Sequence, residues 1–389
     1  MKRYLSYKRK MRIIATASVI MAAVLALVLM LLISDYNEKQ GQKKDELHKL
    51  NIEMYEEMKD SDILYGDGEN KEDTDRREEM KNYDFYQKIK GGMDTYVAFF
   101  GNEAIRKKKN DSTGWVRQFF ETMDNRYTYA RGINCGSKGT DALYGYVALN
   151  ISALKAYEYY DLAVVCYGAY DDPETFSVYY DGLLRSLKNQ NPKCEIYCMI
   201  EADVNGYNEN AETVKKICDL YGGICIDMNE YFESKNVDFT ATLEGITPNQ
   251  YGNQEYLNAI FEVIDENLEN NRQVSSSVKV SFATTRSFDD AKFVSVRNMK
   301  NTSDFIYEFS SSGKLGIFVY KIDPIKGGNV SIFANGRKIA VVDTRYGSSE
   351  EMGIALISTD LDKINRIRID MGSEANSGNL YGMIFGGAK

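Results

Sequence analysis

The stretch Val97-Ala98-Phe99-Phe100-Gly101-Asn102-Glu103-Ala104-Ile105 indicates the fold class of this 389-residue chain. An apolar run followed by glycine and polar residues is typical of a buried strand that ends in a loop. Similar runs alternate with longer helical patterns up to about residue 270, and this alternation predicts an open parallel sheet covered by helices, an α/β fold. The strand candidates are Tyr96–Phe100, Ala163–Tyr167, Glu195–Ile200 and Ile224–Met228.

Helical patterns occupy the intervals between these runs. Two of them begin at Pro173 and Pro248, and proline suits the first turn of a helix. Ligands of open parallel sheets bind at the carboxyl ends of the strands, so a site is expected in the loops after Phe100, Tyr167 and Ile200. The expected helices are Thr113–Met123, Asp141–Tyr159, Pro173–Leu187, Ala211–Leu220 and Pro248–Leu268.

The pattern changes after about Val274 to short alternating runs separated by turn residues. Asn335-Gly336 separates two such runs, and this pair favours a type I′ hairpin because both central positions of that turn need a positive φ. We predict a second, all-β domain over residues 275–389, with about eight strands in a two-sheet sandwich or jelly roll.

The amino-terminal part has the pattern of a membrane anchor. Residues 13–33 carry no charge, and a helix of that length matches a hydrocarbon core about 30 Å thick. Residues 1–12 are basic and acids follow the run, so residues 1–12 are predicted to be cytoplasmic and the later domains extracellular. A cleaved signal peptide is the alternative, but Leu31-Leu32-Ile33-Ser34-Asp35 offers no small-x-small cleavage site. The chain is therefore expected to be a single-pass cell-membrane protein.

Residues 34–90 are interpreted as a stalk. Leu47, Leu50, Met54 and Met58 form one helical stripe, which suits either a short coiled coil or a solvated helix. Residues 66–82 have too few apolar side chains to fold alone. The chain's one histidine, His48, lies in this stalk, far in sequence from the expected site.

Charge and cysteine content exclude several functions. The net charge of −9 argues against a nucleic-acid partner, which would need a basic face. The cysteines are expected to be free thiols, and without a CxxC pair or a neighbouring histidine no metal site is predicted. No cofactor is predicted either. The six cysteines are Cys135, Cys166, Cys194, Cys198, Cys218 and Cys225.

Four short blocks, in order, resemble the signature blocks of the SGNH (GDSL-type) hydrolases. Gly101-Asn102-Glu103, with Gly114-Trp115-Val116 beyond it, is similar to the first block, Gly-Asp-Ser. The second block is matched by Asn134–Thr140, and the third, Gly-x-Asn-Asp, by Gly168–Asp171. Glu244–Asn249 resembles the fifth block, Asp-Gly-x-His-Pro. The resemblance implies a three-layer αβα SGNH-like domain over residues 91–272.

The chain departs from the family at the residues that carry the chemistry. Glu103 stands where the nucleophilic serine is expected, and Tyr170 where an oxyanion-hole asparagine is expected. Glu244 and Thr247 replace the acid and the histidine. Gly136, whose N–H would help to form the oxyanion hole, is retained. Threonine does not titrate near neutrality and cannot replace histidine as a base, so the family's acyl chemistry is predicted to be lost.

Acidic and aromatic residues take the place of this machinery. Two carboxylates about 5–10 Å apart would permit carboxylate chemistry of the glycosidase kind. Ser112 and Ser137 are alternative hydroxyl nucleophiles, although neither has a visible base. The candidate ligand-binding residues are Glu103, Gly136, Tyr170, Asp171 and Glu244.

Three functional hypotheses follow. The first is a non-catalytic, membrane-anchored surface protein that binds or scaffolds an envelope or exported polysaccharide, because its β domain resembles the carbohydrate-binding modules attached to carbohydrate esterases. The second is an active acylhydrolase or O-acetyl transferase that acts on cell-surface polysaccharide. The third is a structural subunit of an envelope assembly with protein partners. The first rests on analogy of fold and domain pairing.

Overall fold

The computed structural model describes residues 82–105, 114–151, 159–204, 208–276, 292–303, 305–347, 352–373, 376 and 378–386. The predicted cytoplasmic tail, the anchor at residues 13–33, nearly all of the stalk and Ser112 lie outside this part of the chain. Within the described part, no helix combines the length and the apolar character that a membrane crossing requires.

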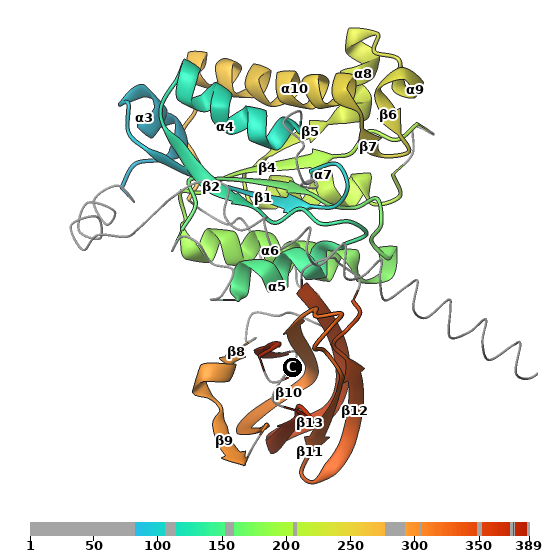
Figure 1. Ribbon diagram of the computed structural model, residues 1–389. Coiled ribbons are helices and arrows are strands. Elements are labelled where there is room, and N and C mark those ends of the chain that lie inside the picture. Colours follow the sequence, from blue (N-terminus) through green and yellow to red (C-terminus); the bar gives the residue numbers. More distant parts are fainter. Residues whose placement is uncertain are drawn as a thin grey trace, which may run out of the picture. The chain divides into compact units, whose positions relative to one another are not determined.

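A five-stranded parallel sheet lies at the centre of the first domain (Figure 1). Its strand order is β2-β1-β3-β4-β5, so the order reverses between β1 and β3. Such a reversal opens a crevice at the carboxyl edge of the sheet, which is the usual ligand site of this fold class. The predicted parallel α/β fold is confirmed. The strands are β1 (Thr95–Gly101), β2 (Ala130–Asn134), β3 (Leu162–Cys166), β4 (Glu195–Ile200) and β5 (Ile224–Asp227).

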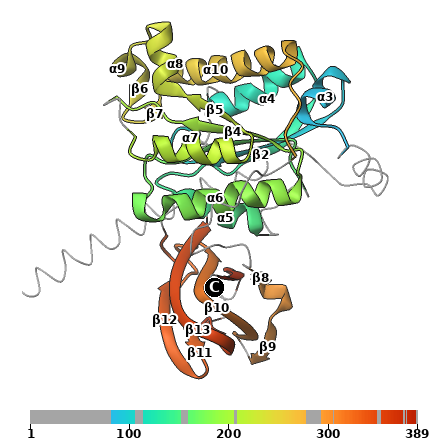
Figure 2. The same ribbon diagram turned by 180° about the vertical axis from the view of Figure 1, so that it is seen from behind.

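Helices cover both faces of the sheet (Figures 1 and 2). Alternate residues of a strand point to opposite faces. Val97 and Phe99 of β1 pack with α3 (Phe85–Lys90), α4 (Trp115–Arg126), α8 (Met228–Lys235) and α10 (Gln250–Glu269). Ala98 and Phe100 pack instead with α5 (Ala142–Asn150), α6 (Pro173–Gln190) and α7 (Ala211–Leu220). The continuous apolar runs in the sequence reflect this burial on both faces.

Several elements of the α/β domain differ from the sequence expectation. Strand β2 was not predicted, since Ala130-Arg131-Gly132-Ile133-Asn134 is only partly buried at the sheet edge and lacks a long apolar run. Gly132 belongs there because a Cβ would lie 1.9 Å from the carbonyl oxygen of Val97. Helix α5 ends at Asn150 and not at residue 159. Helix α8 is an addition, begun by Asp227, whose side chain accepts from the N–H of Asn229.

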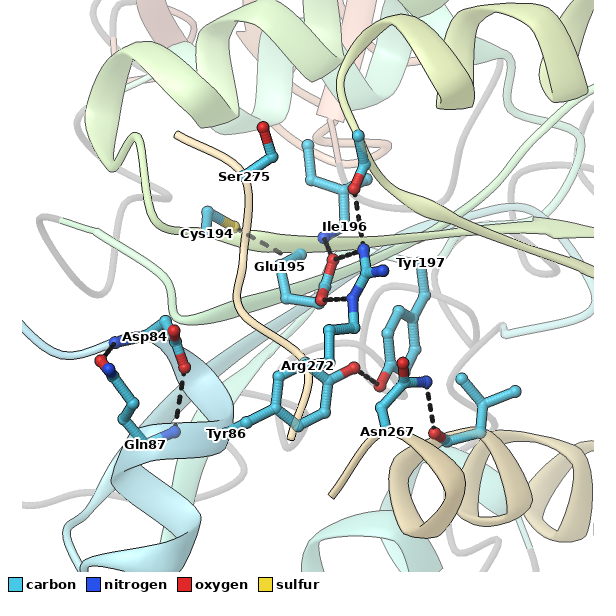
Figure 3. Close-up of polar contacts among 12 residues, drawn as sticks. Asp84, Tyr86, Gln87, Cys194, Glu195, Ile196, Tyr197, Asn267, Arg272 and Ser275 are labelled. Carbon is cyan, nitrogen blue, oxygen red and sulfur yellow. Dashed lines mark hydrogen bonds and ion pairs between the residues drawn. The ribbon is translucent and has the colours of Figure 1, made fainter. Parts of the chain in front are cut away.

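Helix α3 lies in the range assigned to the stalk, yet it packs into the α/β core. Asp84 and Gln87 form a capping box at its start (Figure 3). Buried Lys88 forms an ion pair with Asp161, with 2.7 Å between Nζ and Oδ1, and the Tyr86 hydroxyl lies 2.7 Å from that of Tyr197 on β4. The α/β domain therefore begins before residue 91.

A second buried ion pair fastens the chain after α10 to the amino end of β4 (Figure 3). Glu195 is fully buried, and Arg272 donates to both its carboxylate oxygens, at 2.7 and 3.2 Å. Arg272 also donates to the carbonyl oxygen of Gly222, at 2.8 Å. Burial raises the pKa of Glu195, and Arg272 opposes that rise. This network lies at the end of the sheet opposite to the expected site and is structural.

The second domain is an antiparallel β structure, which confirms its predicted class. Asn335 and Gly336 join β11 to β12 with φ of 50° and 83°, so the predicted hairpin is confirmed. Seven strands of the described residues form one hydrogen-bonded sheet in the order β12-β11-β13-β10-β14-β8, with β9 beside β10. They are β8 (Lys292–Ser295), β9 (Lys300–Ser303), β10 (Ile306–Lys321), β11 (Asn329–Ala334), β12 (Arg337–Asp343), β13 (Met352–Asp370) and β14 (Leu380–Gly386).

Strands β10 and β13 are long and have different neighbours in their two halves. Their pairing shifts register between Ser311 and Leu315, where the ladder is irregular. Residues 306–308 of β10 pair with β9, whereas residues 315–320 pair with β14. The sequence suggested separate strands at 354–358 and 364–369, but β13 runs through both. Because β10 and β13 pair with different strands in their two halves, they join all seven strands into one hydrogen-bonded sheet. The expected two separate sheets are therefore not seen among the described residues.

Candidate functional site

The four blocks converge at the carboxyl edge of the parallel sheet. The first block lies directly after β1, where the Glu103 side chain is partly exposed. Its Oε2 accepts a hydrogen bond from the backbone N–H of Gly139, in the loop after β2, at 3.2 Å. The residue at the nucleophile position is therefore an acceptor that holds two loops together. A carboxyl group at this position cannot form the alkoxide with which a serine attacks an ester.

Gly136, in the second block, uses its N–H inside its own loop. That N–H donates to Asn134 Oδ1 at 2.7 Å, while Asn134 Nδ2 donates to the carbonyl oxygen of Ile105 at 2.8 Å. A Cβ on Gly136 would lie 2.7 Å from this same carbonyl oxygen, so the close approach requires glycine. Close packing therefore explains why glycine is retained at position 136. Its N–H already donates to Asn134 and is not available to an oxyanion.

Asp171, in the third block, joins two loops at the edge of the sheet. Its Oδ1 accepts from the N–H of Ala142 at the start of α5 (2.7 Å), and its Oδ2 accepts from the N–H of Gly168 (3.0 Å). Gly168 has φ of 135°, a conformation that favours glycine. Asp171 is only 7% exposed, and burial raises its pKa to about 8. The geometry assigns this carboxyl a structural role in shaping the loop.

Replacing Asp171 with alanine is expected to lower the free energy of unfolding by about 1–3 kcal/mol at pH 5, because two buried N–H groups lose their acceptor. The raised pKa means that the Asp171 carboxyl supports the fold when protonated, and this support declines as pH rises from about 4 towards 8. The cost of Asp171→Ala should therefore shrink over that interval, as urea melts at several pH values would measure.

The matched control for this prediction is Asp172→Ala. Asp172 is exposed and caps α6 by accepting from the N–H of Glu174, so its loss removes a helix cap without removing a buried carboxyl. Equal pH dependence of the two variants would contradict the role given to Asp171.

The fifth block forms a small hairpin of β6 (Leu243–Glu244) and β7 (Thr247–Pro248). Glu244 and Thr247 are directly paired partners in it, and the Glu244 side chain is exposed. Gly245 occupies the turn with φ of 67°. The hairpin buries Leu243, Ile246 and Pro248, and Ile246 alone of the block lines the neighbouring pocket. Glu244 and Thr247 are not brought to that pocket.

The pocket encloses about 180 Å³ at the carboxyl ends of β3 and β4. Asp171 is the one sequence-predicted site residue in its lining. The loop after Ile200 was an expected location, but no residue in it was singled out. The signal was the acidic Glu201-Ala202-Asp203 run directly after a buried strand. The lining consists of Gly168, Ala169, Asp171, Glu201, Asp203, Asn208, Glu209, Asn210 and Ile246.

Tyr170 lies beside this pocket with 51% of its surface exposed. Its pKa is raised, first by partial burial and then by the charges of Glu103, Glu201 and Asp203. Glu201 is 1% exposed, and burial raises its pKa to about 7, with Glu103 and Asp203 adding to the rise. The structure therefore gathers Glu103, Tyr170 and Asp171 with two acids from the loop after β4.

The described part of the chain shows neither a metal-binding cluster nor a disulfide bond. No cluster of three or more His, Cys, Asp and Glu side chains there is arranged to hold a metal ion. The structure joins none of the six cysteines in a disulfide bond, and the partly exposed ones are Cys135 and Cys225. Trp115 is buried, with its Nε1 donating to the carbonyl oxygen of Ala104, so it packs α4 against the first block.

Neither a family model nor a curated protein matches the sequence. Among solved structures, the chain is similar to a two-domain esterase (CEX) active on acetylated mannans, with a TM-score of 0.54 and 14% identity over 80% of this chain and 94% of that one. The same esterase co-crystallised with mannopentaose gives a TM-score of 0.55 and 13% identity over 80% and 95% of the two chains. The fold is that of an SGNH-like α/β domain followed by a β domain.

A second similar structure, an acetyl xylan esterase, has 17% identity and covers 43% of this chain and 98% of its own, with a TM-score of 0.35. The positions that resemble the catalytic blocks make structural contacts in this chain. Glu103 bonds to a loop and the Gly136 donor is engaged by Asn134. The hairpin at Glu244–Pro248 presents an isoleucine to the pocket.

Proposed function

We propose that this protein is a non-catalytic, membrane-anchored SGNH-type protein that binds an envelope or exported polysaccharide outside the cell. The observation that carries the proposal is the state of the catalytic positions. Glu103 holds a loop, and Gly136 donates inward. Thr247 pairs with Glu244 in a hairpin. Each of these positions makes a structural contact. The α/β fold is therefore retained without the groups that attack and protonate an ester.

The choice of a polysaccharide rests on the fold neighbour and on the shape of the site. The neighbour is a two-domain esterase active on acetylated mannans, and its likeness extends over both domains of this chain. A protein with the fold of such an enzyme also has the carboxyl edge of the parallel sheet, along which a glycan can bind. The pocket after β3 and β4 is lined by carboxyl and amide groups, and Tyr170 offers an exposed ring beside it. Carboxylates and amides bind sugar hydroxyls, and an aromatic face stacks on a sugar ring.

The membrane anchor supports an extracellular role in this proposal. The uncharged run at 13–33, with basic residues before it, would place the α/β and β domains on the outer side of a cell membrane. A binding protein held there meets polysaccharide at a high local concentration, so a modest affinity for each sugar unit suffices.

The proposal predicts that the full-length chain is stabilised by its glycan. A ligand present at 100 times its Kd adds about 2.7 kcal/mol to the free energy of unfolding, which raises the thermal midpoint measurably. The panel should include acetylated mannan, deacetylated mannan, acetylated xylan and an uncharged polymer without sugar as control. A midpoint that moves with a polysaccharide and stays fixed with the control supports binding. If the whole panel leaves it unmoved, the structural-subunit hypothesis is favoured.

A further inference from the structure

The pocket after β3 and β4 is strongly acidic. Four carboxyl side chains line it, from Asp171, Glu201, Asp203 and Glu209, and its described lining includes no Lys, Arg or His. Anionic groups such as uronates or phosphates would be repelled there, since like charges in a partly desolvated site raise the free energy of binding. The charge alone excludes an acidic glycan but does not identify the ligand that binds.

Glu201 supplies an independent observation. It is 1% exposed, and its Oε1 accepts from Asn102 Nδ2 at 2.7 Å. Its Oε2 is buried and has no hydrogen-bond partner in the described structure. Buried carboxylate oxygens are nearly always paired, because an unpaired one carries the full cost of lost solvation. Glu201 also lines the pocket, so a ligand donor that reached this oxygen from there would complete the bond.

Asn208, in the same pocket lining, supplies an unpaired hydrogen-bond donor. Its Oδ1 accepts from the N–H of Asn210 at 2.9 Å, and this contact fixes which end of the amide is the nitrogen. The remaining Nδ2 is buried without an acceptor. The pocket therefore combines an unsatisfied carboxylate acceptor with an unsatisfied amide donor. A ligand that fits must present a strong donor and an acceptor.

We propose that this pocket binds a hexosamine unit with a free amino group, so that the polysaccharide is at least partly de-N-acetylated. The inference rests on the proposed function and names its ligand class. The ammonium group would donate to Glu201 Oε2 with Asp203 and Asp171 nearby, and a hydroxyl on the adjacent ring carbon would accept from Asn208 Nδ2. At about 180 Å³ the pocket is below the roughly 300–1,000 Å³ typical of drug-sized ligands, which suits one sugar residue of a chain.

The amino group decides the choice among sugars. A neutral hydroxyl would give Glu201 Oε2 an ordinary hydrogen bond, whereas an ammonium would favour the ionised carboxylate and give a charge-assisted bond about twice as strong. An N-acetyl group would replace the cation with a neutral amide and add bulk in a small pocket. Burial already raises the pKa of Glu201 to about 7, and no cationic side chain of the described residues opposes that rise.

The test is calorimetric titration of the full-length chain at pH 7.5 with two matched tetramers, one of glucosamine and one of N-acetylglucosamine, and with mannopentaose as a neutral glycan. We expect the glucosamine tetramer to bind at least about tenfold more tightly than its N-acetylated form, equivalent to about 1.4 kcal/mol. Glu201→Gln should remove this preference because its new amide nitrogen faces the ammonium. The charge-matched control is Glu233→Gln, at an exposed position of α8 outside the pocket lining.

Asp203→Asn provides a second variant, at the partly exposed side of the pocket, in case Glu201→Gln does not fold. It should lower the affinity for the glucosamine tetramer more than that for mannopentaose. Equal binding of both tetramers would overturn the amino-sugar assignment while leaving polysaccharide binding intact. Binding of mannopentaose alone would do the same. Displacement of the glucosamine tetramer by CaCl₂ at matched ionic strength would also overturn it, in favour of a cation site. Failure of every glycan to bind would overturn the proposed function as well.

Discussion

Purified protein is expected to hydrolyse a small acetyl ester no faster than buffer alone. Loss of the nucleophile or the base from a catalytic unit of this kind costs on the order of 10⁶ in turnover, and both are absent here. Glu103 occupies the serine position, and its carboxylate accepts from Gly139. Thr247 occupies the histidine position, and the chain's single histidine is His48. The measurement is acetate release by the full-length chain, beside heat-denatured protein as control.

The variant Glu103→Ser with Thr247→His tests whether restoring the serine and the histidine is enough to restore esterase activity. We expect it to stay near the buffer rate, because the Gly136 N–H still donates to Asn134 and Tyr170 still replaces the oxyanion-hole asparagine. Activity in this variant would show that the geometry of the frame has been kept without its chemistry. Activity in the unaltered protein that disappears on Glu103→Ala would refute the non-catalytic proposal and make the carboxylates of this edge catalytic.

Arg272→Met is expected to lower the free energy of unfolding by about 3–5 kcal/mol at pH 8, the usual cost of leaving one member of a buried ion pair alone. Glu195 is fully buried, and Arg272 is its bidentate partner (Figure 3). Without Arg272 the pKa of Glu195 should rise further, so the variant recovers part of its stability as pH falls and the carboxyl is protonated. Urea denaturation at pH 8 and pH 5 measures both effects.

The control is Arg117→Met, which breaks an exposed i,i+4 pair with Glu121 on α4 and should cost less than about 0.5 kcal/mol. The double variant Glu195→Met with Arg272→Met should be less destabilised than Arg272→Met alone, because no charge then remains buried. If Arg272→Met were no less stable than Arg117→Met, the network of Figure 3 would contribute little to folding.

The parts of the fold predictable from sequence are those where burial imposes a simple pattern. Strands β1, β3 and β4 are buried along their whole length and appear as continuous apolar runs. The edge strand β2 is half exposed and contains Arg131 and Gly132, so its sequence resembles a loop. Its place in the sheet depends on register with β1, which is a tertiary property.

Strand length in the β domain depends on tertiary structure in a similar way. Local alternation indicated two short strands at 354–358 and 364–369, but their continuity in β13 follows from pairing with β10 far along the chain. No local pattern records a strand that changes its neighbours midway. The number of strands was therefore close to that observed, while their connection into one sheet was not predictable.

For the site, the sequence located the edge of the sheet but not the contacts made there. The blocks predicted that Glu103, Tyr170 and Asp171 would meet. They did not indicate that Asp171 bonds to two loops or that the hairpin turns Ile246 inward. Glu201 was missed because acids directly after a strand are common in loops. Its importance comes from an unpaired oxygen, which only the three-dimensional structure reveals.

The attachment of helix α3 has a mechanical consequence. Tension that arrives along the chain from before Asp84 reaches the α/β domain at this helix, where Lys88 pairs with Asp161 and Tyr86 bonds to Tyr197. Asp161 also accepts from the N–H of Tyr96 on β1, so the pull is divided between several strands. Such a pull must break the Lys88–Asp161 pair and the Tyr86–Tyr197 hydrogen bond before α3 leaves the domain. These contacts therefore oppose the detachment of α3 from the sheet.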